Sequence, residues 1–389
     1  MRIESQGLIF DAAGRPDSER ISYFTSLCPL ASGAILAGFQ NGPSKHSPHS
    51  TIRLCHSDDG GNTWREVSWR FETVLDGIPG SLAAAEVVES NPGRLLLFTT
   101  WFDRSDPARP LFDPDTEGLL RSRQLLSVST DDGETWGPWR ELNTGGLTGC
   151  AGTGAVVRWA DGAIAFPFES FKEFDDPRPV QPGAWLLVSR DGGETFEPPF
   201  RVAQHPENRT YYWDQRLCPA GSDGEFVALF WTHDRAAKQD LRVHLLHGDL
   251  RRPRTETPLP RETSIPGQIA APLLRPDGLL LAFVVDRGRP GTLTLWVSHD
   301  GGETWPEAEA LLVHRHDERA ALTQGATDID FAQYWEDMGR WSFGHPAIRL
   351  LDDGHVLLAY YAGDPDRMSL HWARVALDAH LADDRGDLR

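Results

Sequence analysis

Two short runs in the middle of the chain combine aromatic rings with carboxylates, guanidinium groups and a histidine. They are Tyr211-Tyr212-Trp213-Asp214-Gln215-Arg216 and Trp231-Thr232-His233-Asp234-Arg235. Aromatic rings beside carboxylates suit sugars, because a sugar ring has apolar faces and hydroxyl edges. Carboxyl groups could act as acid and base, and arginine could hold an anionic group through paired hydrogen bonds. Packed rings and ion pairs are also common structural features of clefts, so a purely structural role stays open.

Further ionisable and aromatic residues fall at the ends of predicted strands, and together they make a candidate site. The candidate catalytic residues are Asp103, Glu169, Asp214, Asp234 and His345. The candidate substrate-binding residues are Tyr23, Trp101, Tyr211, Trp213, Arg216, Arg235 and Arg287. The imidazole of His345 could act as acid, base or metal ligand, or it could merely bond a backbone carbonyl. We expect one pocket to hold Asp214, Glu169, Arg216, Arg235 and His345.

The elements that must position these groups are indicated by an eight-residue frame, Ser-x-Asp-x-Gly-x-Thr-Trp/Phe. Its four copies are residues 57–64, 129–136, 189–196 and 298–305. Each copy follows a short apolar strand. An Asp carboxylate can accept N–H bonds within its own turn, and Gly adopts positive φ without a steric clash. Each frame therefore predicts a hairpin turn whose last aromatic residue packs inward.

The spacing of the frames predicts the architecture. Their closing aromatic residues lie 72, 60 and 109 residues apart along the chain. The longest interval equals two units of about 55 residues, with one degenerate copy between them. A repeat of this size that contains only strands suits a four-stranded propeller blade.

With these frames the chain resembles the sialidase (neuraminidase) superfamily, whose mark is this Asp-box, or BNR repeat. The resemblance implies an all-β fold, a six-bladed β-propeller with four Asp-box hairpins on the face remote from the active centre. We expect one propeller domain over residues 1–389, with residues 314–339 inserted between blades five and six. The candidate pocket would be built chiefly by blades three, four and six.

The resemblance is weaker at the catalytic residues. Sialidases of this superfamily clamp the substrate carboxylate with three arginines and use an Asp acid/base and a Tyr nucleophile paired with Glu. The first arginine would fall at Thr25 or Ser26, and no Tyr occupies residues 342–345. The resemblance therefore implies an exo-acting glycoside hydrolase on a non-sialic or acidic sugar.

Two other functions fit the same residues. An oligosaccharide lyase would use His345 or Tyr211 to remove the proton next to a uronate carboxylate held by arginine. A non-catalytic glycan-binding propeller would show aromatic rings in the funnel but no convergent carboxylates. The products of a lyase absorb ultraviolet light, because a double bond forms, and this separates it from a hydrolase.

Composition limits the partners. The formal net charge of −19 argues against nucleic-acid and anionic-membrane partners, because both require a basic surface. The longest apolar run, residues 279–285, is too short to span a bilayer, and residues 1–7 contain no apolar leader. The four cysteines have no metal-binding spacing, so we expect no metal or cofactor. We expect a cytoplasmic protein with an oligosaccharide or glycoside substrate, and the oligomeric state stays open.

Overall fold

The computed structural model describes residues 1–288, 290–316 and 338–377. Most of the expected insertion at residues 314–339 lies outside these described residues. Within them the regular structure is almost entirely β, with two 3-10 turns, η1 (Asp17–Glu19) and η2 (Glu307–Glu309). No helix among the described residues is long and apolar enough to cross a membrane.

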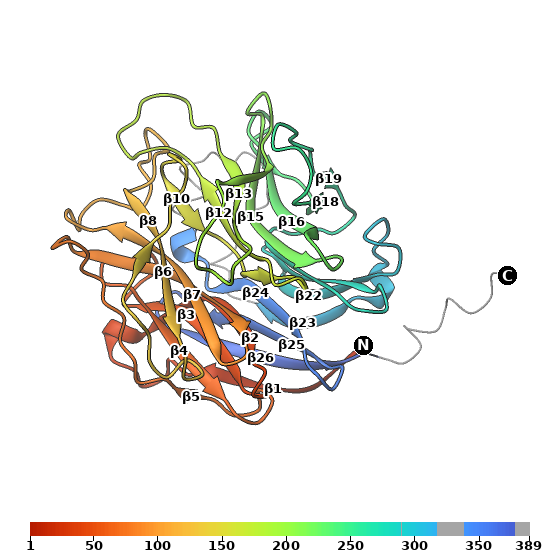
Figure 1. Ribbon diagram of the computed structural model, residues 1–389. Helices are drawn as coiled ribbons and strands as arrows, with labels where there is room; N and C mark the ends of the chain where they lie inside the picture. Colours follow the sequence, from red (N-terminus) through yellow and green to blue (C-terminus); the bar gives the residue numbers. More distant parts are fainter. Residues whose placement is uncertain (289, 317–337, 378–389) are drawn as a thin grey trace.

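The strands form five hydrogen-bonded sheets, which follow one another in chain order (Figure 1). One sheet has the order β6-β7-β8-β9, with the bounds Gly80–Asn91, Arg94–Asp103, Ser122–Ser129 and Arg140–Glu141. The next contains β10 to β14, at Cys150–Gly152, Val157–Arg158, Ile164–Ser170, Gly183–Ser189 and Phe200–Ala203. A third contains β15 to β19, at Thr210–Pro219, Glu225–Asp234, Gln239–Asp240, His244–Asp249 and Arg261–Glu262. A fourth has the order β20-β21-β22-β23, at Ala270–Leu274, Leu280–Asp286, Gly291–Ser298 and Leu311–His316.

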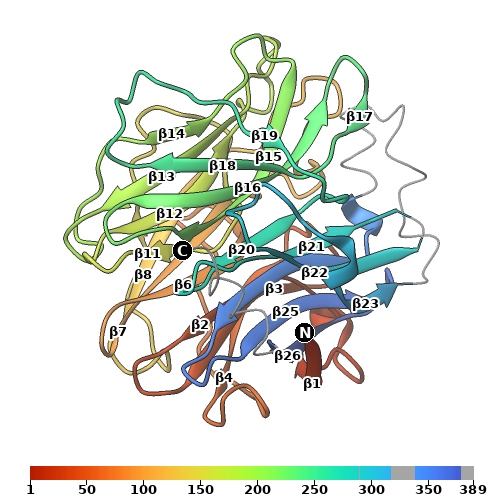
Figure 2. The same cartoon turned by 90° about the vertical axis from the view of Figure 1, so that its right-hand side faces the viewer.

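The fifth sheet joins the two ends of the chain. Its eight strands are β24 (Phe343–Leu350), β25 (Val356–Gly363), β26 (Met368–Ala376), β1 (Arg2–Phe10), β2 (Ile21–Pro29), β3 (Ile35–Gly42), β4 (Thr51–Ser57) and β5 (Arg65–Glu66). β1 pairs antiparallel with β26 along its length, so the N-terminal strand lies beside the C-terminal strands (Figure 2). β26 meets β2 through a single parallel bridge, Ile21 to Met368.

The first strands of these groups surround a common axis. β2 contacts β6 and β24, β15 contacts β11 and β20, and β20 contacts β24. A pocket of about 300 Å³ at one end of this axis is lined by residues from β2, β6, β11, β15, β20 and β24. Cys28 and Cys218 line this pocket, whereas Cys150 packs in a different apolar cluster.

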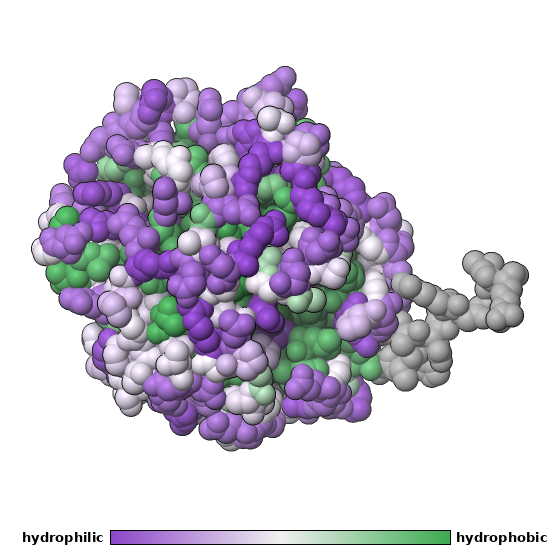
Figure 3. Space-filling view, in the orientation of Figure 1, coloured by the Kyte–Doolittle hydropathy of each residue, from purple (hydrophilic) through white to green (hydrophobic). Residues whose placement is uncertain are grey.

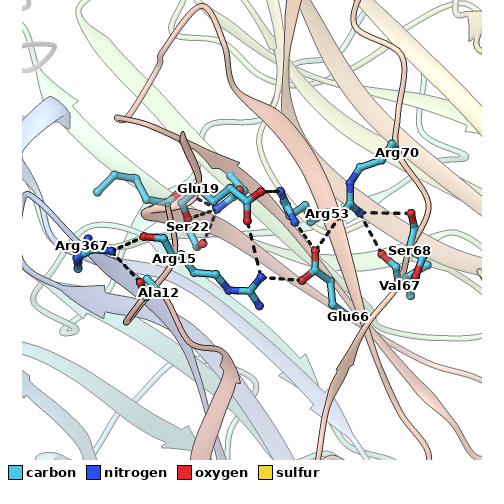
Figure 4. A network of polar contacts seen from close by, with 12 residues as sticks. Ala12, Arg15, Glu19, Ser22, Arg53, Glu66, Val67, Ser68, Arg70 and Arg367 are labelled. Carbon is cyan, nitrogen blue, oxygen red and sulfur yellow. Dashed lines mark hydrogen bonds and ion pairs between the residues drawn. The ribbon is translucent and has the colours of Figure 1, made fainter. Parts of the chain in front are cut away.

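An ion network fixes the segment between β1 and β2 (Figure 4). The buried guanidinium group of Arg53 pairs with Glu19 at 2.6 Å and also with Glu66. Arg15 pairs with Glu66 at 3.2 Å, and Arg367 donates to the carbonyl oxygen of Arg15 at 3.1 Å. The network holds the chain at the point where it passes from the last strands to the first.

Hydrophilic residues cover most of the face in Figure 3, and hydrophobic ones form separate patches.

In all four eight-residue frames the Ser and Thr hydroxyls donate to the Asp carboxylate, and the three frames that end in Trp add an indole bond. In residues 298–305, Ser298 Oγ donates to Asp300 Oδ1 at 2.7 Å. The amide and the hydroxyl of Thr304 donate to the Asp300 carboxylate at 2.9 and 2.6 Å. The indole of Trp305 donates to the Gly302 carbonyl oxygen at 3.1 Å, and its ring is buried. The sequence predicted a turn whose last aromatic residue packs inward, and residues 298–305 form such a turn.

We expect Asp300→Ala to lower the free energy of unfolding by about 1–3 kcal/mol, because it leaves hydrogen-bond donors of the turn unpaired. Urea denaturation would measure this loss. Asp352→Ala, in the exposed turn between β24 and β25, is the matched control and should have little effect. If Asp300→Ala abolished activity per folded molecule and left stability unchanged, the turn would be a functional element and this interpretation would be wrong.

Candidate active site

A shared distortion of four inner strands places two of the candidate residues. In β2, β6, β15 and β24, two residues oppose a single residue of the next strand, so each of these strands carries one extra residue. The first residue of each such pair has positive φ: Phe24 (55°), Ala84 (61°), Asp214 (46°) and His345 (51°). This conformation is costly for a residue with a side chain, and it persists where the surrounding structure enforces it. Such bulges re-aim side chains, and here they present Asp214 and His345.

A pair of carboxyl groups forms the centre of the site. Glu169, on β12, is 5% exposed, and its Oε1 accepts the backbone N–H of Gln215 at 3.4 Å. Burial raises the pKa of Glu169 well above its usual value, and the negative charge of Asp214 raises it further. Burial also raises the pKa of Asp214, against the opposing charges of Arg216 and Arg287. The two groups therefore titrate as a pair, with Glu169 better suited to hold the proton.

Arg216 is the cation nearest to this pair. Its Nη2 lies 3.5 Å from Asp214 Oδ1, and its Nη1 donates to the Pro346 carbonyl oxygen at 3.4 Å. The side chain is 2% exposed. A Cβ on Gly154 would come within 3.2 Å of Arg216 Cγ and 2.6 Å of the Gln215 carbonyl oxygen. Glycine at 154 therefore leaves the space that the buried arginine needs.

His345 is held as a neutral ring. Its Nδ1 donates to the Thr25 carbonyl oxygen at 3.2 Å, and its ring centroid lies 4.7 Å from that of Phe24. Burial and the positive charge of Arg216 lower its pKa well below the usual value. A carbonyl oxygen only accepts, so the ring proton is on Nδ1 and Nε2 is unprotonated. The sequence left open whether His345 acts as acid, base or metal ligand, or only bonds a backbone carbonyl. The structure shows the bond to a backbone carbonyl.

A second cationic cluster lies on the β24–β25 side of the site. Lys45 Nζ donates to the Tyr361 hydroxyl at 2.8 Å, and burial lowers the pKa of Lys45. Arg287 Nη1 donates to Gln268 Oε1 at 2.7 Å. A Cβ on Gly344 would come within 2.4 Å of Arg287 Nη2, so a side chain there would displace this guanidinium group, and the φ of 144° at Gly344 also favours glycine.

Arg235 and Tyr211 belong to a separate cluster. Arg235 Nη2 lies 3.3 Å from Glu117 Oε2, and its guanidinium carbon lies 4.7 Å from the centroid of the Tyr211 ring. The Tyr211 hydroxyl donates to the same Glu117 oxygen at 3.4 Å. Trp213 stacks on the ring of His233 with 5.8 Å between centroids. The structure therefore brings Asp214, Glu169, Arg216 and His345 together, but it places Arg235 against Glu117.

Asp103 and Asp234 hold turns of the backbone. Asp103 Oδ1 accepts the amide and the hydroxyl of Ser105 at 2.9 and 2.6 Å, and it lines an outer pocket of about 670 Å³. Asp234 Oδ1 accepts two backbone amides, those of Ala236 and Ala237, at 2.9 and 3.0 Å. The amide of Ala237 is the main cause of the lowered pKa of Asp234. Their local chemistry is that of turn-stabilising carboxylates, in contrast to the catalytic role expected from sequence.

Trp101 and Tyr23 are packing residues. Trp101 is fully buried, and its indole donates to the Thr73 carbonyl oxygen at 2.8 Å. Tyr23 is 1% exposed, and its hydroxyl accepts the His46 amide at 2.7 Å. Neither side chain offers a free face to a ligand, in contrast to the substrate-binding role expected from sequence.

Three charged residues near the site were not among the candidates. They are Lys45, Glu86 and Arg349. Glu86 carries the one charge in the otherwise apolar stretch 82–88, and a buried charge requires a partner. That pattern could have identified it. Lys45 lies in the loop after β3, and this position at a strand end is the sequence signal for it.

We expect Asp214→Asn to lower the pKa of Glu169, because the substitution removes a negative neighbour. Carbon-13 NMR of labelled glutamate carboxyl groups would measure the titration. Asp234→Asn is the matched control, because Asp234 ends β16 and accepts hydrogen bonds from backbone amides of the following turn. An unchanged Glu169 titration in Asp214→Asn would show that the two carboxyl groups do not interact.

Comparisons with known proteins support the fold. No family model matches the chain, and no curated protein matches it. A protein of unknown function from Dyadobacter fermentans has a TM-score of 0.69 at 18% identity, covering 97% of this chain and 99% of that chain. The Hadza microbial sialidase Hz136 has a TM-score of 0.65 at 17% identity, covering 96% and 68%. An alpha-L-arabinanase from Penicillium chrysogenum, complexed with arabinobiose, has a TM-score of 0.61 at 15% identity, covering 96% and 98%. The chain therefore has the sialidase-like β-propeller fold.

Proposed function

We propose that this protein is a glycoside hydrolase whose acid–base pair is Glu169 and Asp214. One observation carries the proposal: the buried carboxyl group of Glu169 and the largely buried one of Asp214, whose side chain is 14% exposed, lie beside Arg216 with the pKa values of both raised. Perturbed carboxyl groups with a specific charge partner are typical of acid–base catalysis. The sialidase and arabinanase neighbours have names that denote glycoside hydrolases, which supports the same class.

We also propose that the propeller has six blades and that the four frames are its Asp-boxes. The eight-stranded sheet would count as the sixth and first blades, because a single bridge joins its two halves. Six first strands line one axial pocket, which supports the count. The region from 249 to 261, between β18 and β19, carries no frame, as expected for the degenerate blade. One propeller domain over the whole chain is part of this proposal.

The proposed mechanism assigns a role to each of the two carboxyl groups according to its protonation state. Glu169 holds a proton because burial and Asp214 both oppose its ionisation, so it would protonate the glycosidic oxygen. Asp214 keeps more negative charge because Arg216 and Arg287 face it. It would act as nucleophile if the carboxyl groups stand about 5 Å apart in the complex, or as base for water at roughly 6.5–9.5 Å. Proton NMR of the first sugar product separates these routes by its anomeric configuration.

The proposed substrate is a non-sialic or acidic sugar removed from the end of a glycan. The positive charge of Arg287 opposes the rise in the pKa of Asp214. The charges of Lys45 and Arg287 both help to lower the pKa of His345. These cations would suit an anionic substituent. We keep a cytoplasmic location as part of the proposal, since the four cysteines are free and buried.

The two rival functions have less support. A binding propeller needs no acid–base pair, yet Glu169 and Asp214 converge. A lyase would need Tyr211 or His345 as its base. The Tyr211 hydroxyl faces Glu117, and burial raises its pKa, which disfavours the phenolate. The ultraviolet absorbance of the product would identify a lyase.

We expect Asp214→Asn and Glu169→Gln each to lower kcat by at least about 100-fold, the usual size of an acid–base contribution. The measurement is release of 4-nitrophenol or reducing sugar across a panel of glycosides and oligosaccharides. Asp103→Asn is the control and should retain activity, because its carboxylate bonds to Ser105 at the outer rim. Full activity in both site variants would refute the assignment.

We expect little or no release of sialic acid from a sialoside. At the position expected for the first clamp arginine, the hydroxyl of Thr25 donates to the His345 carbonyl oxygen and that of Ser26 to the Ala85 carbonyl oxygen. Neither group can supply the charge-assisted pair that an arginine would give. Efficient sialic acid release by the purified protein, lost in Asp214→Asn, would overturn this expectation.

A further inference from the structure

The four bulged inner strands place one further layer of side chains across the propeller axis. The first residue after each bulge is Ser26 in β2, Glu86 in β6, Arg216 in β15 and Ala347 in β24. Ser26 and Ala347 have short side chains, whereas Glu86 and Arg216 have long ones. Both long side chains are almost fully buried, at 1% and 2% exposure. The repeated register therefore sets a carboxyl group and a guanidinium group in the same layer.

The charged groups that face Glu86 are two guanidinium groups. Arg216 faces it from β15, and Arg349 faces it from β24. The thiols of Cys28 on β2 and Cys218 on β15 lie near Arg349, and burial raises the pKa of each to about 12, so they are neutral. Glu86 Oε1 has no hydrogen-bond partner among the described residues. Arg349 and Arg216 are therefore the groups that respond to its charge.

Arg216 interacts both with the carboxyl pair of Asp214 and Glu169 and with Glu86. Its positive charge interacts with Asp214, then with Glu86, then with Glu169. Its Nε has no hydrogen-bond partner in the described part of the chain. The guanidinium group is therefore held by charge more than by a closed set of hydrogen bonds. Charge on Glu86 competes with the carboxyl pair for it.

We propose that Glu86 is a positioning residue that controls how strongly Arg216 acts on the carboxyl pair of Asp214 and Glu169. The inference rests on the proposed function for its catalytic consequence. Glu86 itself does not touch a substrate, since it lies in the layer beneath Asp214. It acts through Arg216.

The ionisation of Glu86 gives this arrangement a dependence on pH. Burial raises the pKa of Glu86 to about 7, although Arg216 and Arg349 oppose the rise. Below that pH, Glu86 is neutral, and Arg216 directs its charge to Asp214 and Glu169. Above that pH, Glu86 is ionised, and the positive charge of Arg216 is divided between Glu86 and the carboxyl pair of Asp214 and Glu169. The added negative charge then helps Glu169 to keep its proton.

Glu86→Gln is the variant that tests the inference. Below about pH 7 the native side chain is itself neutral, so the amide resembles it in size and charge. We expect the pKa of the Asp214–Glu169 pair to fall by about one unit, the scale of the effect of a nearby buried charge. Carbon-13 NMR of labelled carboxyl groups would measure it, with Glu169→Gln and Asp214→Asn used to assign the signals. Glu72→Gln, on an exposed loop, is the matched control.

Thermal stability gives an independent measurement on Glu86 itself. A carboxyl group whose pKa is raised on folding contributes stability at low pH that is lost as pH rises from the unfolded to the folded pKa. For Glu86 that window runs from 4.5 to about 7. The Tm of Glu86→Gln relative to the native protein should therefore rise across this window. If the amide variant does not fold, Glu86→Met removes the same charge at similar length and carries the same expectations.

Activity on the glycoside panel separates this inference from the proposed function. We expect the basic limb of kcat/KM against pH to move to lower pH in Glu86→Gln and not in Glu72→Gln. A fall in the pKa of the pair without any glycosidase activity would support the positioning role and refute the proposed function. An unchanged pKa of the pair in a folded Glu86→Gln protein would overturn the positioning role, whatever the activity.

Discussion

The arrangement at the axis depends on one constraint: charges placed in a buried channel must neutralise one another. Arg216 is 2% exposed and meets the charges of Asp214, Glu86 and Glu169. Removing any one of these from water is costly, and only the mutual attraction offsets that cost. These three carboxyl groups and the guanidinium group of Arg216 therefore form one electrostatic unit. Their pKa values belong to the unit and not to single residues.

Stability and function use different repeated devices in this fold. The four Ser-x-Asp-x-Gly turns close hairpins with hydrogen bonds from hydroxyl and amide groups to one carboxylate. The four inner strands instead carry a bulge with a non-glycine residue at positive φ. The turns satisfy polar groups locally, whereas each bulge stores strain and turns a side chain toward the axis. Asp214 and His345 owe their positions to the second device.

Sequence patterns identified only some of the residues of the candidate site. Asp214, Glu169, Arg216 and His345 were candidates because they stand at strand ends beside aromatic residues. Asp103 and Asp234 had the same appearance, yet each accepts hydrogen bonds from the residues that follow it. Sequence does not separate these cases, because two of the groups that interact with Asp214, namely Glu169 and Arg287, are distant along the chain. Lys45 shows the same limit: its position at a strand end marks it as a polar residue, but its partner Tyr361 is 316 residues away.

The class of structure follows from the sequence alone, because the repeated frame and its spacing depend on local chemistry. An Asp carboxylate two residues after a Ser forms its turn from contacts within eight residues, so the local pattern predicts the turn. Which charged groups share a site, in contrast, depends on the fold as a whole. The bulge register sets Glu86 and Arg216 in one layer although 130 residues separate them. Proximity of that kind follows from closure of the ring, which no local pattern encodes.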